Sequence, residues 1–171
     1  YFLAYLVRVS PVSVAKGFLE TVFPFLPAML PFLLVYQVPG FEDLLSLDAS
    51  RIFQLAPITN LQYANLLQGI LLLGTGLSAL GVLSLRSSFS IMTEARELVT
   101  GGIYRYISHP MYLGQFLTYF GIASFHSSRG SWILYVVFLG LQFVRLRLEE
   151  RKLKGAFSEY DAYRKSCWIA L

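Results

Sequence analysis

The chain alternates long apolar runs with shorter polar segments. The apolar runs cover residues 18–38, 60–85, 107–125 and 131–144. A hydrocarbon core of roughly 30 Å needs about 20 helical residues, so the first two runs are long enough to span it and the third is marginal. The fourth follows the third after a short turn at 126–130, which predicts an antiparallel hairpin of spans. Tyr1 to Val9 covers only about 14 Å of helix, and is either the end of a longer span or an interfacial segment.

Two of these runs contain residues with a specific structural effect. Pro24, Pro27 and Pro31 lie within 18–38, and each removes a backbone donor and clashes with the preceding turn, so this helix should be kinked or broken. Small residues let another helix approach closely. In 60–85 they are Gly69, Gly74, Gly76, Ser78 and Gly81.

The polar segments should lie at or outside the membrane surface. Pro39 to Thr59 mixes acidic and apolar residues, which is typical of an interfacial loop with a short amphipathic helix. Arg86 to Tyr106 should lie on the membrane surface, and the alternating charges of Arg145 to Lys165 predict a helix that leaves the bilayer and continues in water. We therefore expect an N-terminal part, 1–59, and a core, 60–171, within one domain. The fold class is all-α, an integral membrane helical bundle of about four to five transmembrane helices.

Composition agrees with this membrane assignment. Hydrophobic residues make up 56% of the chain and charged residues only 14%, and the mean hydropathy of +0.57 is far from that of ordinary globular domains. A net charge of +4 could indicate a nucleic-acid partner. However, the basic residues lie between the apolar runs and in the C-terminal segment, which indicates membrane topology and no nucleic acid.

The distribution of basic residues also predicts an orientation. Only Arg51 and Arg129 lie on one side of the predicted spans. The other side holds Arg8, Lys16, Arg86, Arg96, Arg105 and the seven basic residues from Arg145 to Lys165. By the positive-inside rule the latter side, including the C-terminal helix, is cytoplasmic. The single Cys167 and the separated His109 and His126 predict no metal site.

The chemically unusual stretch is Leu98 to Gly114, which places polar groups between two strongly apolar segments. Its sequence His109-Pro110-Met111-Tyr112 brings an imidazole and a phenol together at membrane depth, where polar groups are costly unless they serve a site. Pro110 disfavours helix at His109 and suits the first turn of the following span. The imidazole would then face bound polar groups or, alternatively, donate to a backbone carbonyl.

Glu149 and Glu150 form a second polar group at the same membrane boundary. On a helix adjacent residues point about 100° apart, so only one of the two can face a given ligand atom. Helical steps of three and four from Glu149 predict a packed face, with the basic residues outside, made of Leu153, Ala156, Tyr160 and Tyr163. The alternative is a surface carboxylate paired with Arg145 or Lys154. Together with His109, these carboxylates could build one site.

From Gly81 to Tyr163 the sequence resembles the isoprenylcysteine carboxyl methyltransferase family and its relatives, which include the membrane phospholipid N-methyltransferases. The resemblance rests on the order and spacing of several short elements. They are Phe89-Ser90-Ile91-Met92, Glu94-Ala95-Arg96-Glu97-Leu98-Val99, Gly102-Ile103-Tyr104-Arg105-Tyr106, His109-Pro110-Met111-Tyr112-Leu113-Gly114, the pair Glu149-Glu150, and Phe157, Tyr160 and Tyr163.

The resemblance implies a small helical membrane enzyme that binds S-adenosylmethionine at the cytoplasmic boundary. It implies that the adenosine end is lined by Leu98, Val99 and Tyr104. His109 and Tyr112 would contact the cofactor, and Glu149 or Glu150 would bind its amino acid or ribose portion. Tyr160 and Tyr163 would close the pocket. Positioning and exclusion of water should supply most of the rate, so no catalytic residue is assigned.

The expected methyl acceptor is hydrophobic or lipid-like, and it could reach the site from the bilayer between the glycine-rich span and the His109 span. Two other functions are compatible with the pattern. Membrane sterol and enone reductases, which use NADPH, share a related His-Pro-x-Tyr element, and Ser108, where the resembled family usually has Arg, keeps open a non-catalytic membrane scaffold. The small size favours a bacterial inner membrane over the endoplasmic reticulum.

Overall fold

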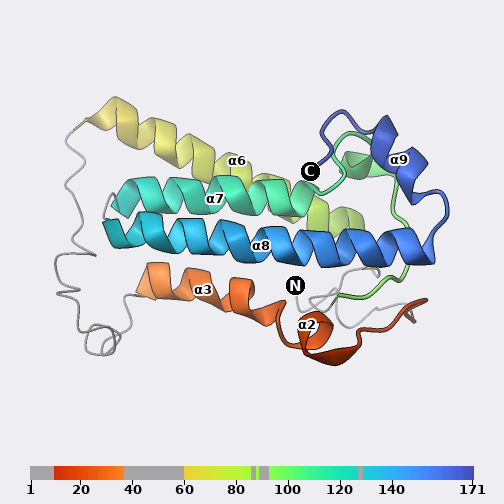
Figure 1. Cartoon of the computed structure of the whole chain (residues 1–171). Helices are drawn as coiled ribbons and strands as arrows, with labels where there is room; N and C mark the ends of the chain where they lie inside the picture. The colour runs from red at the N-terminus through yellow and green to blue at the C-terminus, as the bar shows by residue number, and fades with distance from the viewer. Residues whose placement is uncertain (1–9, 37–59, 86–87, 89–92, 127–128) are drawn as a thin grey trace.

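The computed structural model describes residues 10–36, 60–85, 88, 93–126 and 129–171. Within these ranges the chain is helical and has two isolated bridges, Ser13 with Ala95 and Ile107 with Ile169, in place of strands. The elements are α2 (Gly17–Thr21), α3 (Phe25–Tyr36), α6 (Leu61–Leu85), η2 (Gly102–Arg105), α7 (Pro110–His126), α8 (Arg129–Ala156) and α9 (Tyr160–Ser166). The helices α3, α6, α7 and α8 run side by side, while η2 and α9 gather at one end of the bundle (Figure 1).

The helices α6 and α7 pack against each other with almost no side chain between them. A Cβ on Gly74 would lie 2.6 Å from the backbone nitrogen of Thr118, and one on Gly114 would lie 2.5 Å from the backbone nitrogen of Ser78. The predicted close packing through small residues is thereby confirmed at Gly74, Ser78 and Gly81, whereas Gly69 and Gly76 face open space. The same packing contradicts the expected acceptor route between these two helices, because their backbones are in contact.

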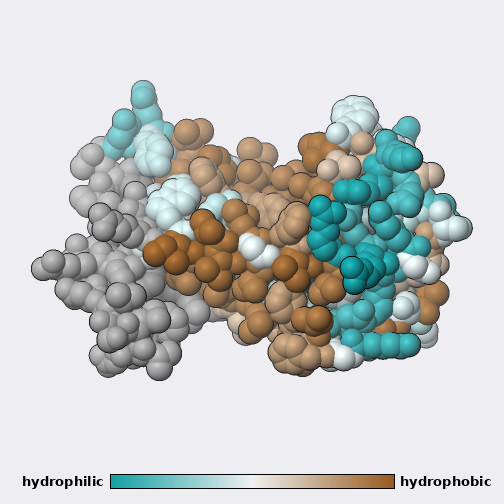
Figure 2. All heavy atoms as spheres, viewed as in Figure 1, coloured by the Kyte–Doolittle hydropathy of each residue, from teal (hydrophilic) through white to brown (hydrophobic). Residues whose placement is uncertain are grey.

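The surface of the bundle is apolar along its middle and polar at the end that contains α9 (Figure 2). Large hydrophobic side chains on α6 and α8 point outward, with Leu73 71% exposed and Val136 64% exposed. Two helices in the described ranges are long and apolar enough to cross a membrane, Leu61–Leu85 and Gly130–Ala156, and only 17% and 28% of their apolar windows are buried. Core helices of soluble proteins are mostly buried, so these exposed apolar faces suit lipid.

The other predicted spans differ from the structure or lie outside it. The described part of this run, residues 18–36, forms two helices that separate at Val22 to Pro24, as the prolines predicted, although Pro31 lies inside α3 without ending it. The helix α7 begins at Pro110 and not at Ile107, because Ile107 pairs with Ile169 and the proline fixes the first helical turn. The predicted segments Tyr1 to Val9 and Pro39 to Thr59 lie outside the described residues.

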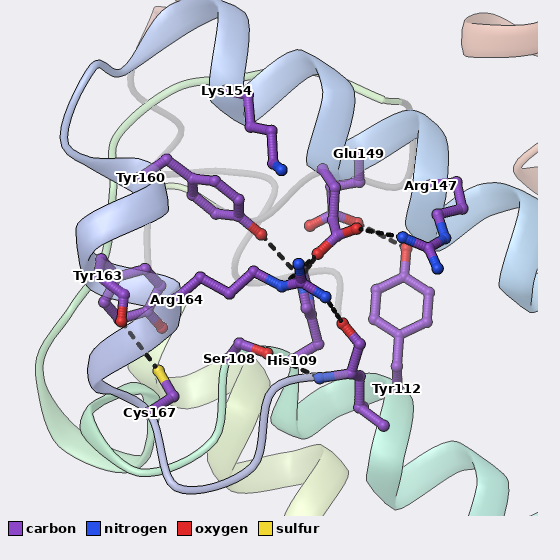
Figure 3. Close-up of polar contacts among 12 residues, drawn as sticks. Ser108, His109, Tyr112, Arg147, Glu149, Lys154, Tyr160, Tyr163, Arg164 and Cys167 are labelled. Atoms are coloured by element: carbon purple, nitrogen blue, oxygen red, sulfur yellow. Dashed lines mark hydrogen bonds and ion pairs between the residues drawn. The ribbon is translucent and has the colours of Figure 1, made fainter.

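The helix α8 is one continuous element of 28 residues, about 42 Å long. The sequence pattern predicted a helix that leaves the bilayer after Val144 and continues in water to Lys165; α8 does continue past Val144, but the predicted extension to Lys165 was wrong, because the helix ends at Ala156. The chain leaves the helix after Ala156, near Gly155, and turns back through Phe157 to Glu159 into α9. Tyr160 and Tyr163 are therefore not on a continuation of the Glu149 helix face, but come back toward the bundle on α9 (Figure 3).

The segment between α6 and α7 also differs from the prediction of a membrane-surface segment. Thr93, Ala95 and Tyr104 are buried, although Glu97 and Arg105 are exposed. The N-terminal segment covers part of it: the Val12 and Ser13 amides both donate to the Ala95 carbonyl, at 2.8 and 3.0 Å. Residues 10–16 are called the N-terminal strap below. Because the segment between α6 and α7 lies between this strap and the end of the helix bundle, it forms an inner wall at that end.

Candidate functional site

A cavity lies at the polar end of the bundle, between α8, α9, the start of α7 and the segment 93–104. The empty space between its lining atoms, including open solvent at its mouth, is about 700 Å³. Its lining consists of Leu85, Ser88, Thr93, Glu94, Arg96, Glu97, Leu98, Val99, Tyr104, Ser108, His109, Met111, Arg145, Glu149, Leu153, Tyr160 and Tyr163.

Seven of the nine residues expected to hold a cofactor line this cavity. They are Leu98, Val99, Tyr104, His109, Glu149, Tyr160 and Tyr163. Tyr112 and Glu150 do not line it, but each contacts a residue that does: the Tyr112 hydroxyl donates to Glu149 Oε2 at 2.6 Å, and Glu150 lies beside His109. The structure thus brings together residues from four separate parts of the chain, whereas their role toward a cofactor stays a prediction.

The two adjacent glutamates have different surroundings, as their angular separation on α8 requires. Glu149 faces the cavity and accepts the Tyr112 hydrogen bond. Glu150 is buried among cations: its carboxylate lies 2.8 Å from Arg164 Nε, although without the angles of a hydrogen bond, and accepts from Arg147 Nη1 at 3.3 Å. Glu150 therefore links α9 to α8, and Glu149 is the carboxylate available to a ligand.

His109 lies at the junction of α7 and α9. Its Nε2 is 3.1 Å from the Tyr160 hydroxyl and 3.9 Å from Glu150 Oε1. Burial lowers the pKa of His109 below its usual value, although the negative charges of Glu149 and Glu150 oppose this shift. At neutral pH the imidazole is therefore uncharged, and its Nε2 contacts a side-chain hydroxyl.

The tyrosines of the cavity keep their protons. Burial raises the pKa of Tyr104, Tyr160 and Tyr163, and nearby Glu149 adds to this shift at Tyr104. Tyr163 donates a hydrogen bond of 2.8 Å to the Tyr104 carbonyl, so α9 is attached to η2. These phenols act as neutral donors and as aromatic faces, not as bases at neutral pH.

Several lining residues were not assigned to the site from sequence. Arg145 was expected outside, but it is only 6% exposed and lies over the Tyr112 ring, with Cζ 5.6 Å from the ring centroid. Its spacing of four from Glu149 could have placed both on one helix face. Glu94 and Arg96 also line the cavity. In an extended segment residues two apart share a face, so Glu94 and Arg96 lie on the same face as Leu98. This spacing could have assigned them to the site, but the prediction placed the whole segment on the membrane surface.

Ser108 forms hydrogen bonds with the C-terminal segment. Its Oγ accepts from the Leu171 amide at 3.2 Å, and its amide donates to the Ile169 carbonyl at 3.0 Å. Arg164 Nη2 donates to the Leu171 carbonyl at 2.9 Å, so the same guanidinium contacts both Glu150 and this segment. A positive charge is thus present near Ser108, although it comes from α9.

An apolar helical bundle with a polar, aromatic cavity at one end has the architecture of a small membrane enzyme. Residues 63–160 match the phospholipid methyltransferase family. This match covers more than half of the chain, which therefore belongs to that family of membrane methyltransferases and confirms the resemblance found in the sequence. The match gives no support to the reductase and scaffold alternatives. A comparison with curated proteins finds no match.

Proposed function

We propose that this protein transfers a methyl group from S-adenosylmethionine to a hydrophobic or lipid-like acceptor at a membrane boundary. The observation that carries the proposal is the cavity itself, in which the Glu149 carboxylate is held by Tyr112 and the tyrosines 104, 160 and 163 line the walls. A carboxylate and aromatic faces both favour a bound cation. Family membership supplies the reaction class.

The residues present fit this methyl donor. Bound S-adenosylmethionine would supply a methyl group already activated by its sulfonium charge. Leu98 and Val99 offer an apolar wall for a flat base, and Glu149 offers a negative charge for an ammonium group. The remaining predicted contacts, from His109, Tyr160 and Tyr163, would close the cavity from α7 and α9. We propose 60–171 as the core that carries this site.

The protein residues in this proposal bind and orient the reactants. A carboxylate close to a sulfonium stabilises the ground state, whereas the positive charge decreases as the methyl group leaves, so Glu149 is assigned to binding and not to rate enhancement. Positioning two reactants within a closed, water-poor site supplies much of the rate in such displacements. The fixed network of His109, Tyr160 and Glu150 keeps α9 in place over the cavity.

Several further features of the proposal come from the chain as a whole. The apolar surfaces of α6 and α8 support a position of the cavity at the boundary of a multi-pass membrane protein, and the basic residues favour its cytoplasmic side. A bacterial inner membrane is part of the proposal. The lipid bilayer would supply the acceptor, of which a phospholipid is one form, following the family description, and an isoprenylcysteine another.

Calorimetric titration of the detergent-purified protein tests the methyl donor. S-adenosylmethionine and S-adenosylhomocysteine should bind with micromolar affinity, and NADPH should not. Glu149→Gln should weaken S-adenosylmethionine binding at least tenfold, since hydrogen bonds and ion pairs to charged groups contribute about 1.5–3 kcal/mol. Glu159→Gln is the matched control, because Glu159 is exposed and lies outside the cavity. Binding of NADPH alone would contradict the proposal.

The acceptor is tested by transfer of a labelled methyl group. The protein is incubated with methyl-labelled S-adenosylmethionine and either phosphatidylethanolamine vesicles or the farnesyl thioether of N-acetylcysteine. Label extracted with the first acceptor indicates a phospholipid, and label extracted with the second indicates isoprenylcysteine-like specificity. Label in neither, with the donor bound, would show that the acceptor lies outside both classes.

A further inference from the structure

One wall of the cavity carries a polar group that the fold does not satisfy. Arg96 lines the cavity and its side chain is only 7% exposed. Its Nη2 lies 2.7 Å from Glu94 Oε2, whose side chain is 9% exposed. Its Nε is buried and has no hydrogen-bond partner among the residues that the structure describes. An unsatisfied buried donor costs about 1–3 kcal/mol, so such a donor on a side chain that lines a cavity indicates a missing acceptor.

The neighbouring Glu94 carboxylate restricts what that acceptor can be. An anionic oxygen beside Arg96 Nε would approach the negative charge already paired with this guanidinium. Like charges at such separations are unfavourable. A hydroxyl group avoids this repulsion, because its oxygen can accept from Arg96 Nε while its hydrogen is donated toward the carboxylate. The pair therefore suits a neutral hydroxyl better than a phosphate or a carboxylate.

The position of the pair along the wall selects the kind of hydroxyl compound. After Glu94 and Arg96 come the exposed Glu97, which also lines the cavity, and then Leu98 and Val99, which line it with apolar side chains. A nucleoside has this sequence of properties, with ribose hydroxyls next to a flat apolar base. Tyr104 also lines this region of the cavity. A ribose at Arg96 would therefore place its base against Leu98 and Val99.

We infer that Glu94 and Arg96 bind a ribose hydroxyl of the methyl donor, with Arg96 Nε as the donor of the recognising hydrogen bond. The inference rests on the proposed function and extends it, because it moves recognition of the ribose from Glu149 or Glu150 on α8 to the segment that contains Glu94 and Arg96. Glu149 is then left for the amino acid portion. The N-terminal strap holds this wall in place through Ser13 and Ala95, the residue between the pair.

Deoxy analogues of S-adenosylhomocysteine measure this hydrogen bond directly by calorimetry. The wild-type protein should bind S-adenosylhomocysteine about tenfold or more tightly than its 2′-deoxy or its 3′-deoxy analogue. In Arg96→Gln the ratio of the affinities for S-adenosylhomocysteine and for a deoxy analogue should fall to nearly one, because the hydroxyl has no hydrogen bond to Arg96 Nε left to lose. Arg96→Lys keeps the charge but not the planar fork, so it should also lose most of the preference. Arg151→Gln, an exposed site outside the cavity, should keep it.

The outcomes separate this inference from the proposed function. If the wild-type protein binds no S-adenosylhomocysteine, the proposed methyl donor is wrong. If it binds S-adenosylhomocysteine and both deoxy analogues equally, or if Arg96→Gln weakens all three ligands by the same factor, Arg96 has only a structural role and the ribose inference is overturned. The wild-type comparison needs no variant, so a misfolded Arg96→Gln protein does not prevent the test.

Discussion

The Tyr112 hydroxyl donates a hydrogen bond of 2.6 Å to Glu149 Oε2 and so joins the first turn of α7 to the polar end of α8. Tyr112 is 1% exposed, and the Arg145 guanidinium lies over its ring. A buried phenol between a carboxylate and a cation has few alternative positions. Glu149 is therefore oriented by Tyr112, which does not itself line the cavity, and this explains how the carboxylate can face a ligand in one conformation.

Tyr112→Phe should weaken S-adenosylmethionine binding about threefold to tenfold, because Glu149 loses one bond and a fixed orientation, at a cost near 1 kcal/mol. Calorimetry measures the change. Tyr135→Phe is the matched control: its hydroxyl donates to the Phe116 carbonyl at 3.3 Å, outside the cavity. Equal affinities for the two variants would show that Tyr112 does not orient the binding carboxylate.

Glu150→Gln should reduce stability more than it reduces binding, the reverse of Glu149→Gln. Its carboxylate pairs with Arg164 and Arg147 and lies beside His109. Removing one partner of a buried ion pair costs about 3–5 kcal/mol, and the lower part of that range applies because the Arg164 side chain is 28% exposed. Thermal unfolding in detergent should show a large decrease in Tm. A Tm equal to that of wild type would contradict the proposed link between α8 and α9.

Sequence patterns predicted the parts of this fold that local chemistry determines. The proline at position 110 begins α7, the small residues Gly74, Ser78 and Gly81 mark the face that α7 covers, and the break before α3 contains Pro24. In each case the residue type restricts the backbone or the approach of a neighbouring helix, so its effect does not depend on distant contacts.

The return of α9 and the inner wall could not be predicted in the same way. Charges between 145 and 165 indicated a water-exposed helix, and this interpretation overrode the helix-end signal of Gly155. Arg96 and Arg145 were placed on the surface because charged residues usually lie there. Their burial depends on partners far along the chain, such as Tyr112 for Arg145 and the strap residue Ser13 beside Ala95, which no local pattern contains.

Stability should decrease with acid partly through His109. Burial lowers its pKa, so the folded protein binds fewer protons there than the unfolded chain does. The stabilisation from neutral His109 is complete above about pH 6.5, the usual imidazole value, and is lost as the pH falls through the lower pKa of the folded protein. The charged groups that act on the His109 ring are Glu149, Glu150 and Arg164. All three are the same in the wild type and in the variant His109→Gln. Between pH 8 and 5, Tm should fall more steeply for wild type than for His109→Gln; parallel curves would contradict this assignment.

Lys152→Met should loosen the N-terminal strap. Lys152 Nζ donates to the Val14 carbonyl at 2.6 Å and also pairs with Glu20, and its side chain is only 9% exposed. Burial alone would raise the pKa of Glu20, but the hydrogen bonds and charges of Lys152 and Lys16 together lower it below its usual value. Hydrogen exchange at residues 12–16 should become faster. Lys154→Met is the control, because its pair with Asp161 is largely exposed and such pairs contribute about 0–1 kcal/mol. Equal exchange in the two variants would remove Lys152 as an anchor of the strap.

Gly74→Ala should destabilise the protein, whereas Gly76→Ala should not. A Cβ at position 74 would lie 2.6 Å from the Thr118 nitrogen and 2.7 Å from the Gly114 carbonyl oxygen, backbone atoms that move only if α6 and α7 separate. Such overpacking costs about 1–3 kcal/mol. At position 76 nothing lies within 4 Å of the added Cβ, and alanine favours helix over glycine by up to about 1 kcal/mol. Thermal unfolding should therefore give a lower Tm for the first variant and an equal or higher Tm for the second. The reverse order would mean that α6 and α7 are not in backbone contact, and a lateral route between them would again be open to the acceptor.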